Sequence, residues 1–391
     1  MNDFGNFTNF RGYDLTSRKL KIRNAINLIP PKTPDDIPVI AQTPCYFGFG
    51  NKKRSPLYWE EPAHMLNFQQ DGYELHFKYV SDDTVPYFMP WFGTGVVASA
   101  FGCGIRPASG DGDDPGVIST VIDKVGDIAK LKRPDPNKDG YMPRVLKFME
   151  YAARHGEIPV GYTDLNSPLS TAAQMCGYVN LFYWMYDEPQ AIHDLMSVIC
   201  ESFTDWAKAQ REISGEPFGC SNGLQGIWTP KGGIWMADDD LVSINGDLYA
   251  EFVLPHYSNI FELFGGGHLH YCGNGTHQID NIKNMRGVTV VNNSPMGNAD
   301  AFAKLCGAAG DAKFAVEIQD AAPNDPETYY KNLFSGIGDM TGIMVATFVE
   351  DNLAMNNLGQ TIYVDRDPFN AANNVVKAVR GAAASVSVMG L

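Results

Sequence analysis

The sequence predicts a single (β/α)8 barrel, an α/β fold, preceded by a short N-terminal arm. Short apolar segments alternate with longer amphipathic ones from about residue 37 onward. Such alternation is typical of a parallel sheet covered by helices on its outer side. The number of repeats suits eight strands better than an open sheet of five or six. We therefore expect an arm over residues 1–35 and the barrel over residues 36–391.

The first part of the chain supplies the arm and the first strand. One helix is expected in the arm, over residues 15–27. The segment IPVIAQ (37–42) predicts a strand, because it is rich in β-branched residues and flanked by proline. A helix over residues 59–72 and an extended segment over residues 73–80 are expected next. The glycine-rich stretch 89–116 is expected to form loops at the barrel mouth.

The βα alternation is clearest after residue 140. Strands are expected at residues 158–164, 218–223, 266–274, 287–293, 313–320 and 342–351. Helices are expected at residues 140–155, 170–214 (with a break near Pro189), 246–264, 276–285, 299–309, 326–337 and 368–383. Barrel enzymes carry their chemistry at the C-terminal ends of the strands. That rule selects Asp164, Asn222, the segment HLHYCGN (268–274), Asn292, Asn293, Glu317, Gln319 and Glu350.

Charge and cysteine content narrow the class of function. Lys and Arg total 30 against 45 Asp and Glu, which gives a formal net charge of −15. This balance disfavours nucleic acid and anionic membranes as partners, since both require clustered basic residues. The first residues hold no apolar stretch typical of a signal peptide, so a cytoplasmic location is expected. The seven cysteines are scattered and form no CxxC pair, which indicates reduced thiols.

Several segments resemble the uroporphyrinogen decarboxylase superfamily. HYCGN (270–274) resembles the HxCGN element of its zinc methyltransferases, of which the methylcobalamin:coenzyme M methyltransferases are the best known. GGIWMADDDLVSINGDLYAEFVLPHY (232–257) looks like the superfamily's SDD…SPELYEEFVLPY segment. Residues 161–196, 92–105 and 128–136 also match its usual anatomy, so the resemblance spans nearly all of the chain after residue 35.

Two departures from the superfamily pattern bear on the substrate and on the metal ligands. The decarboxylases carry an RQAGRY-like motif whose arginines hold porphyrinogen carboxylates, whereas this chain reads QTPCYFGFGNKKR at the corresponding place. Uroporphyrinogen is therefore not the expected substrate. The zinc methyltransferases usually place a second cysteine at the end of the last barrel strand, where this chain reads VATFVED. Glu350 is the nearest replacement ligand in that segment.

The spacing of His270 and Cys272 suits a shared metal ion. Residues i and i+2 of a strand point to the same side, so an imidazole nitrogen and a thiolate sulfur can converge on one zinc ion. Glu350 is expected as a third ligand, with His268 and Glu317 as alternatives. Three protein ligands leave the fourth position open, as in catalytic zinc sites. The opposing interpretation is that His270 and Cys272 are an ordinary buried pair without metal.

Other polar residues at the barrel mouth are candidates for catalysis or substrate binding. Asp164, Asp239 and Glu317 are the candidate catalytic residues, and Tyr162, Asn222, Trp228 and Asn292 are the candidate substrate-binding residues. For the acidic run 238–240, helix capping and solvation are the commoner roles. For Tyr162 and Trp228 the alternative is plain core packing.

The resemblance implies a zinc-dependent methyltransferase that works with a corrinoid (cobalamin), carried by a separate protein or free. A methyl group would move between the corrinoid and a small methyl ether, methylamine or thiol. The alternative within the same superfamily is a metal-free decarboxylase or lyase, in which Asp164 or the run 238–240 polarises a small non-porphyrin substrate. A non-catalytic binding barrel is the third hypothesis, favoured by the missing strand-end cysteine.

Overall fold

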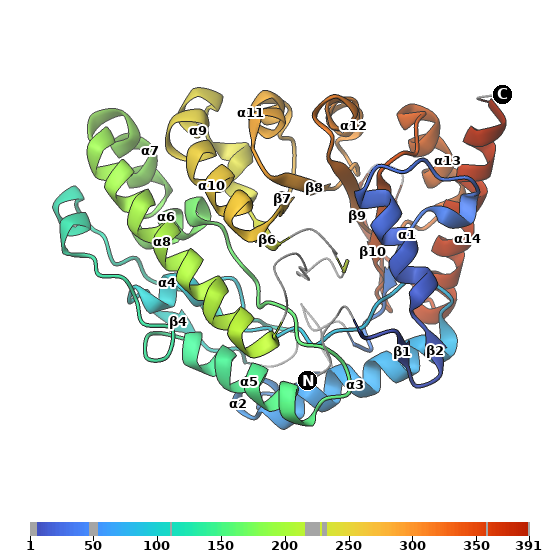
Figure 1. The fold of residues 1–391 in the computed structure, drawn as a ribbon, viewed down its shortest axis with the longest axis horizontal. Coiled ribbons are helices and arrows are strands. Elements are labelled where there is room, and N and C mark those ends of the chain that lie inside the picture. Colours follow the sequence, from blue (N-terminus) through green and yellow to red (C-terminus); the bar gives the residue numbers. More distant parts are fainter. Residues whose placement is uncertain are drawn as a thin grey trace.

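The computed structural model describes residues 6–46, 54–109, 112–215, 227–228, 233–356 and 359–389. At its centre lies one six-stranded parallel sheet with the order β3-β10-β9-β8-β7-β6. Its strands are β3 (Val39–Gln42), β6 (Ile234–Ala237), β7 (Gly267–His270), β8 (Val288–Asn293), β9 (Ala315–Ala321) and β10 (Ile343–Phe348). Figure 1 shows the neighbouring strands β6 to β10 with helices on their outer side.

Two extended segments close this sheet into a ring. Isolated parallel bridges join Phe88 to Val160, and Asn166 to Ala237 in β6. The backbone N–H of Asp83 donates to the carbonyl oxygen of Val39 in β3, at 2.8 Å. The segments around Phe88 and Val160 therefore fill the gap between β3 and β6. The α/β barrel expected from the sequence is confirmed, with two of its eight members irregular.

Prolines explain why these two members form bridges rather than regular strands. Pro86, Pro90 and Pro159 lack a backbone N–H and cannot complete a ladder of hydrogen bonds. Side chains supply the missing contacts. The Gln69 amide accepts from the N–H of Met89 at 2.7 Å and donates to its carbonyl oxygen at 2.8 Å, so one buried side chain satisfies both groups.

The helices cover the outside of the ring (Figure 1). The longer ones are α3 (Pro62–Tyr79), α5 (Met142–His155), α6 (Pro168–Cys176), α7 (Tyr178–Asp187), α8 (Pro189–Ser214), α9 (Gly246–Phe252), α10 (Leu254–Phe264), α12 (Ala299–Ala312), α13 (Pro326–Ile337) and α14 (Pro368–Met389). Capping follows ordinary rules: Ser167 accepts from the Ser170 N–H at the start of α6, and Gly215 ends α8 in the left-handed conformation. Among the described helices, none combines the length and the apolar character that a membrane crossing requires.

The N-terminal arm packs where the barrel strands begin. Its hairpin, β1 (Asn9–Phe10) and β2 (Tyr13–Asp14), leads into α1 (Thr16–Ile26). Lys21 of α1 contacts Asp83 at 2.8 Å, beside the start of β3. Trp228 lies against the same helix, with the Lys19 ammonium 4.8 Å from its ring centre. The arm therefore covers the end of the barrel opposite to the C-terminal strand ends.

Three expected elements differ from the structure. Residues 73–80 were expected to be extended, but all except Val80 lie in α3, because the buried residues Met65, Gln69, Tyr73, His76 and Phe77 follow helical spacing. The expected helix 246–264 is interrupted at Val253, which separates α9 from α10. The strand expected at residues 218–223 lies outside the described residues, and β6 instead occupies part of a segment expected to be a loop.

We expect Gln69→Leu to lower the free energy of unfolding by about 3 kcal/mol, because it leaves the buried N–H and C=O of Met89 without partners. Urea denaturation followed by circular dichroism measures the change. Gln190→Leu, at an exposed position of α8, is the control and should change the value by less than about 0.5 kcal/mol. A Gln69→Leu variant as stable as the control variant would contradict this explanation of the irregular segments.

Candidate metal site

The pairing of β6 with β7 places two loops side by side at the C-terminal ends of these strands. Ala237 is in register with His270, and the N–H of Asp238 donates to the His270 carbonyl oxygen at 2.8 Å. Directly after β6, the 3-10 helix η3 (Asp239–Ser243) begins. The Asp239 carboxylate accepts a hydrogen bond from the Cys272 N–H at 2.8 Å. The two loops are thus joined at the positions where polar side chains gather.

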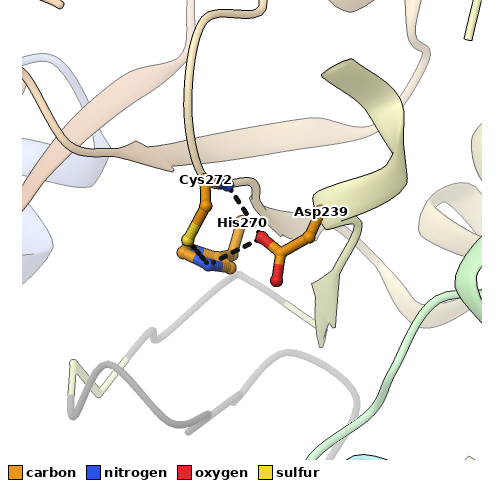
Figure 2. A group of neighbouring side chains, drawn as sticks. All are labelled: Asp239, His270 and Cys272. Atoms are coloured by element: carbon orange, nitrogen blue, oxygen red, sulfur yellow. Dashed lines mark hydrogen bonds and ion pairs between the residues drawn. The ribbon is translucent and has the colours of Figure 1, made fainter. Parts of the chain in front are cut away.

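Asp239, His270 and Cys272 form one cluster (Figure 2). The Cys272 Sγ and His270 Nε2 atoms are 3.4 Å apart, and His270 Nε2 lies 3.4 Å from Asp239 Oδ1. All three ligand atoms lie within 4.8 Å of one another. The imidazole is buried, whereas the carboxylate and the thiol are exposed. A substrate can therefore approach the cluster from the side of Asp239 and Cys272.

A short hydrogen bond to Asn292 in β8 orients the His270 ring. His270 Nδ1 meets the side-chain oxygen of Asn292, which is fully buried and in register with His270. An amide oxygen only accepts, so Nδ1 carries the proton and donates it. When the imidazole is neutral, the lone pair is then on Nε2, which faces Cys272 and Asp239. Fixing the tautomer by a hydrogen bond to the distant nitrogen is typical of metal-binding histidines.

The cluster is electrostatically suited to a cation. Burial lowers the pKa of His270, but its contacts with Asp239 and Cys272 outweigh burial and raise that pKa well above its ordinary value. Partial burial raises the pKa of the Asp239 carboxyl, yet its contacts with His270 and Cys272 bring that pKa below the usual range. Positive charge between these groups is therefore favoured, whether a proton or a metal ion supplies it.

The distances match those of a tetrahedral zinc site. Zinc bonds are about 2.3 Å to sulfur and about 2.0–2.1 Å to nitrogen or oxygen. At tetrahedral angles, such bonds place sulfur and nitrogen about 3.6 Å apart, and nitrogen and oxygen about 3.4 Å apart. The observed separations are 3.4 Å in both cases. The residues present thus fit a zinc ion with three protein ligands and one open position.

Residues behind the ligands hold both loops in place. Gln278, in the 3-10 helix η4 (Thr276–Gln278), is buried and donates to the carbonyl oxygens of Leu241 and Ile244, both of which follow Asp239. Asn293 donates to the carbonyl oxygen of Tyr271 at 2.7 Å, next to Cys272. Asp238 accepts from Ser167 at 2.7 Å and from Tyr249 at 2.9 Å, which identifies it as a structural residue. Such outer contacts keep metal ligands near their bound geometry.

Gly267 allows this strand to sit close to its covering helix. A Cβ atom at that position would lie 2.1 Å from the Phe261 ring of α10. Any other residue would therefore push β7 and α10 apart. The glycines before His268 are consistent with this packing, while the polar residues of β7 point into the barrel.

The third member of the cluster is Asp239, whereas Glu350, the expected third ligand, is not among the residues that the structure brings together there. Glu350 follows β10, is exposed, and its carbonyl oxygen accepts from Arg366 at 3.1 Å. In the sheet, β8 and β9 separate β10 from β7, whereas β6 is directly adjacent to β7. Strand adjacency thus favours a ligand from the loop after β6. Asp239 was expected as a catalytic residue rather than as a ligand.

The remaining candidates fall at different places. Asp164 is buried near the cluster: burial and the Asp239 carboxylate raise its pKa to about 7, and His270 offsets part of that rise. Glu317 in β9 lies inside the barrel, with its Oε2 atom 2.8 Å from Nε2 of His268. Tyr162 is buried two residues before Asp164. Trp228 lies at the opposite end of the barrel, against α1, and Asn222 lies outside the described residues.

Trp235 in β6 is a site residue that the sequence analysis missed. Its ring is fully buried and stacks on the His270 imidazole, with centroids 6.1 Å apart and planes at 18°. The strand expected at residues 218–223 concealed it, since Trp235 was then taken as part of a loop. Trp235 lies two residues before Ala237, the partner of His270, and this pairing follows from the strand register and not from the local sequence.

Comparisons with known proteins agree with the fold. Residues 74–227 match the family model described as uroporphyrinogen decarboxylase (URO-D). The uroporphyrinogen decarboxylase of Proteus mirabilis (strain HI4320) is 29% identical over 123 residues, which are 29% of this chain and 33% of that relative. This match therefore spans about a third of the relative's length. The family match includes Asp164 and ends before Asp239, so it says nothing about the cluster.

A solved structure is similar over a much larger part of the chain. The methyltransferase from Methanosarcina mazei aligns with a TM-score of 0.63 and 15% sequence identity, covering 93% of this chain and 98% of that one. At this identity the likeness establishes a shared fold. Together with the family match, it confirms the resemblance to the uroporphyrinogen decarboxylase superfamily stated from the sequence.

We expect Asn292→Leu to lower the affinity for zinc by about 10- to 100-fold, because His270 loses the acceptor that fixes its tautomer. Competition with a chromophoric chelator measures the dissociation constant. Asn284→Leu, an exposed change at the end of α11 (Ile279–Asn284), is the control and should leave the constant unchanged. Equal zinc affinity in the two variants would refute the assigned role of Asn292.

Proposed function

We propose that this chain, which carries the uroporphyrinogen decarboxylase family match over residues 74–227, is a zinc-dependent methyltransferase. In this proposal a methyl group moves between a small methylated compound (a methyl ether, methylamine or thiol) and a corrinoid. The observation that carries the proposal is the spacing of Asp239, His270 and Cys272, which fits zinc with one open position. The corrinoid acts as the second substrate, brought by a separate protein or free.

Each residue of the cluster has a defined part in this proposal. His270 binds through Nε2 while Asn292 keeps the proton on Nδ1. Cys272 and Asp239 supply negative charge and face the mouth. When bound, the zinc ion would hold the sulfur, oxygen or nitrogen atom of the substrate and stabilise negative charge on it. Trp235 and the buried strand residues exclude water from one side of the imidazole.

The similar protein of Methanosarcina mazei is a methyltransferase, which is compatible with methyl transfer here, and the sequence argues against a porphyrinogen substrate. A polycarboxylate substrate requires several arginine forks. The ion pairs of Asp239 and Glu317 are with histidines, so this part of the described barrel offers carboxylates rather than cationic anchors. A compound with few or no carboxylates suits such a site better.

One observation favours a second candidate function, a metal-free decarboxylase or lyase. Asp164 is buried, and its raised pKa of about 7 suits a general acid or base near neutral pH. In that case Asp164 would exchange a proton with the substrate, while His270 and Asp239 would form a charged pair. This candidate predicts activity that survives chelation and the loss of the Cys272 thiol.

Metal content tests the proposal. We expect purified wild-type protein to retain about one zinc ion per chain, and Cys272→Ala to lose it because one of three ligands is removed. Cys306→Ala is the matched control, since this thiol is half-buried on α12 and is not a member of the cluster. Elemental analysis after dialysis measures the zinc.

A methyl-transfer assay then separates the two enzyme classes. We expect chelation to abolish transfer between methylcobalamin and a panel of thiols, ethers and amines, and added zinc to restore it. Equal zinc in wild type and Cys272→Ala, or methyl transfer that persists after chelation, would refute the zinc methyltransferase. The absence of methyl transfer with every compound of the panel, in the presence of zinc, would favour the lyase.

A further inference from the structure

Beside the cluster, a row of polar residues crosses three neighbouring strands. His270 in β7 is in register with Asn292 in β8, which is in register with Glu317 in β9. The contacts of His270 with Asn292, and of His268 with Glu317, show that these side chains share the inner face of the barrel. The row therefore extends from His270 along the inner wall of the barrel.

Several atoms of this interior have no hydrogen-bond partner among the described residues. They are Asp164 Oδ1, Trp235 Nε1, His268 Nδ1, Asn292 Nδ2 and Glu317 Oε1. Their residues are at most 2% exposed. Burying polar groups without partners costs about 1–3 kcal/mol each, so a native barrel is not expected to leave five of them unmatched. A bound polar molecule, together with water, would satisfy them.

The charged groups of the barrel interior limit the chemistry of that molecule. Two carboxyl groups, Asp164 and Glu317, lie in the interior and a third, Asp239, borders it. Within the described residues, Glu317 and Asp239 form ion pairs with His268 and His270, and the charged groups that act on Asp164 are Asp239 and His270. These carboxylates would repel an anionic group of the substrate, whereas an ammonium group can donate three hydrogen bonds to them.

We propose that the barrel interior, through Asp164 and the row from His270 to Glu317, selects a small substrate that carries an amino group. A second atom of the same substrate reaches the cluster of Asp239, His270 and Cys272. This inference rests on the proposed function, because it concerns the substrate of the same site. Asp164 and Glu317 bind the ammonium group, and Asn292 stands between that group and His270. Substrates with a sulfonate or carboxylate tail in the same place are rejected by repulsion.

Three thiols of equal chain length provide the test, namely 2-aminoethanethiol, 2-mercaptoethanol and 2-mercaptoethanesulfonate. The protein is loaded with Co²⁺ in place of zinc, so that thiolate binding is read from the charge-transfer absorption without any turnover. We expect the aminothiol to bind at least about 10-fold more tightly than mercaptoethanol, and the sulfonate to bind most weakly. Glu317→Gln and Asp164→Asn should each reduce the ratio of the affinities for the aminothiol and for mercaptoethanol to less than about 3-fold.

Glu150→Gln, an exposed change on α5, is the control and should keep the full preference. A sulfonate that binds as tightly as the aminothiol would overturn the inference while leaving the zinc methyltransferase standing. If no thiol changes the cobalt spectrum, the metal-based function fails instead. In that event, the inference is tested by ligand-detected NMR with ethylammonium and ethanesulfonate on the metal-free protein. Tighter binding of ethylammonium would support the inference. Equal binding, or tighter binding of ethanesulfonate, would overturn it.

Discussion

The hydrogen bond from the Cys272 N–H to the Asp239 carboxylate joins the two loops on which the candidate site depends. Asp239 follows β6, and Cys272 follows β7, so the contact requires these strands to be neighbours in the correct register. The pairing of Ala237 with His270 provides that register. A shift of the strand pairing by one residue would turn His270 toward the outer helices and separate it from both Asp239 and Cys272. The site is therefore a direct consequence of parallel strand pairing.

Electrostatics explain why these three side chains coexist in a small volume. A carboxylate and a thiol beside a buried imidazole favour positive charge between them, as the raised pKa of His270 indicates. Asn292 holds the distant nitrogen, and Trp235 covers one face of the ring. The same barrel interior contains the carboxyl groups of Asp164 and Glu317, the latter paired with His268. An arrangement of this kind suits a cation and disfavours a substrate with many carboxylates.

The sequence was sufficient to predict the barrel and to locate His270 and Cys272, because strand periodicity and local spacing act over a few residues. It was insufficient for the third member of the cluster, since whether Asp239 or Glu350 lies beside His270 depends on which strands are adjacent in space. At residues 73–80 the apolar pattern fits both the two-residue period of a strand and the 3.6-residue period of a helix. In the structure this segment is helical up to Tyr79, and Tyr73 and Phe77 are buried on the same side of α3. Trp228 was misplaced because the segment before β6 contacts the N-terminal helix rather than the mouth.

The central claim, that Asp239, His270 and Cys272 bind one zinc ion, is tested most directly by X-ray absorption at the zinc edge of the purified protein. The account predicts one sulfur neighbour at about 2.3 Å and nitrogen or oxygen neighbours at about 2.0–2.1 Å, with the sulfur shell absent from Cys272→Ala. A zinc environment made only of nitrogen and oxygen in the wild type, or one that is unchanged in Cys272→Ala, would contradict it.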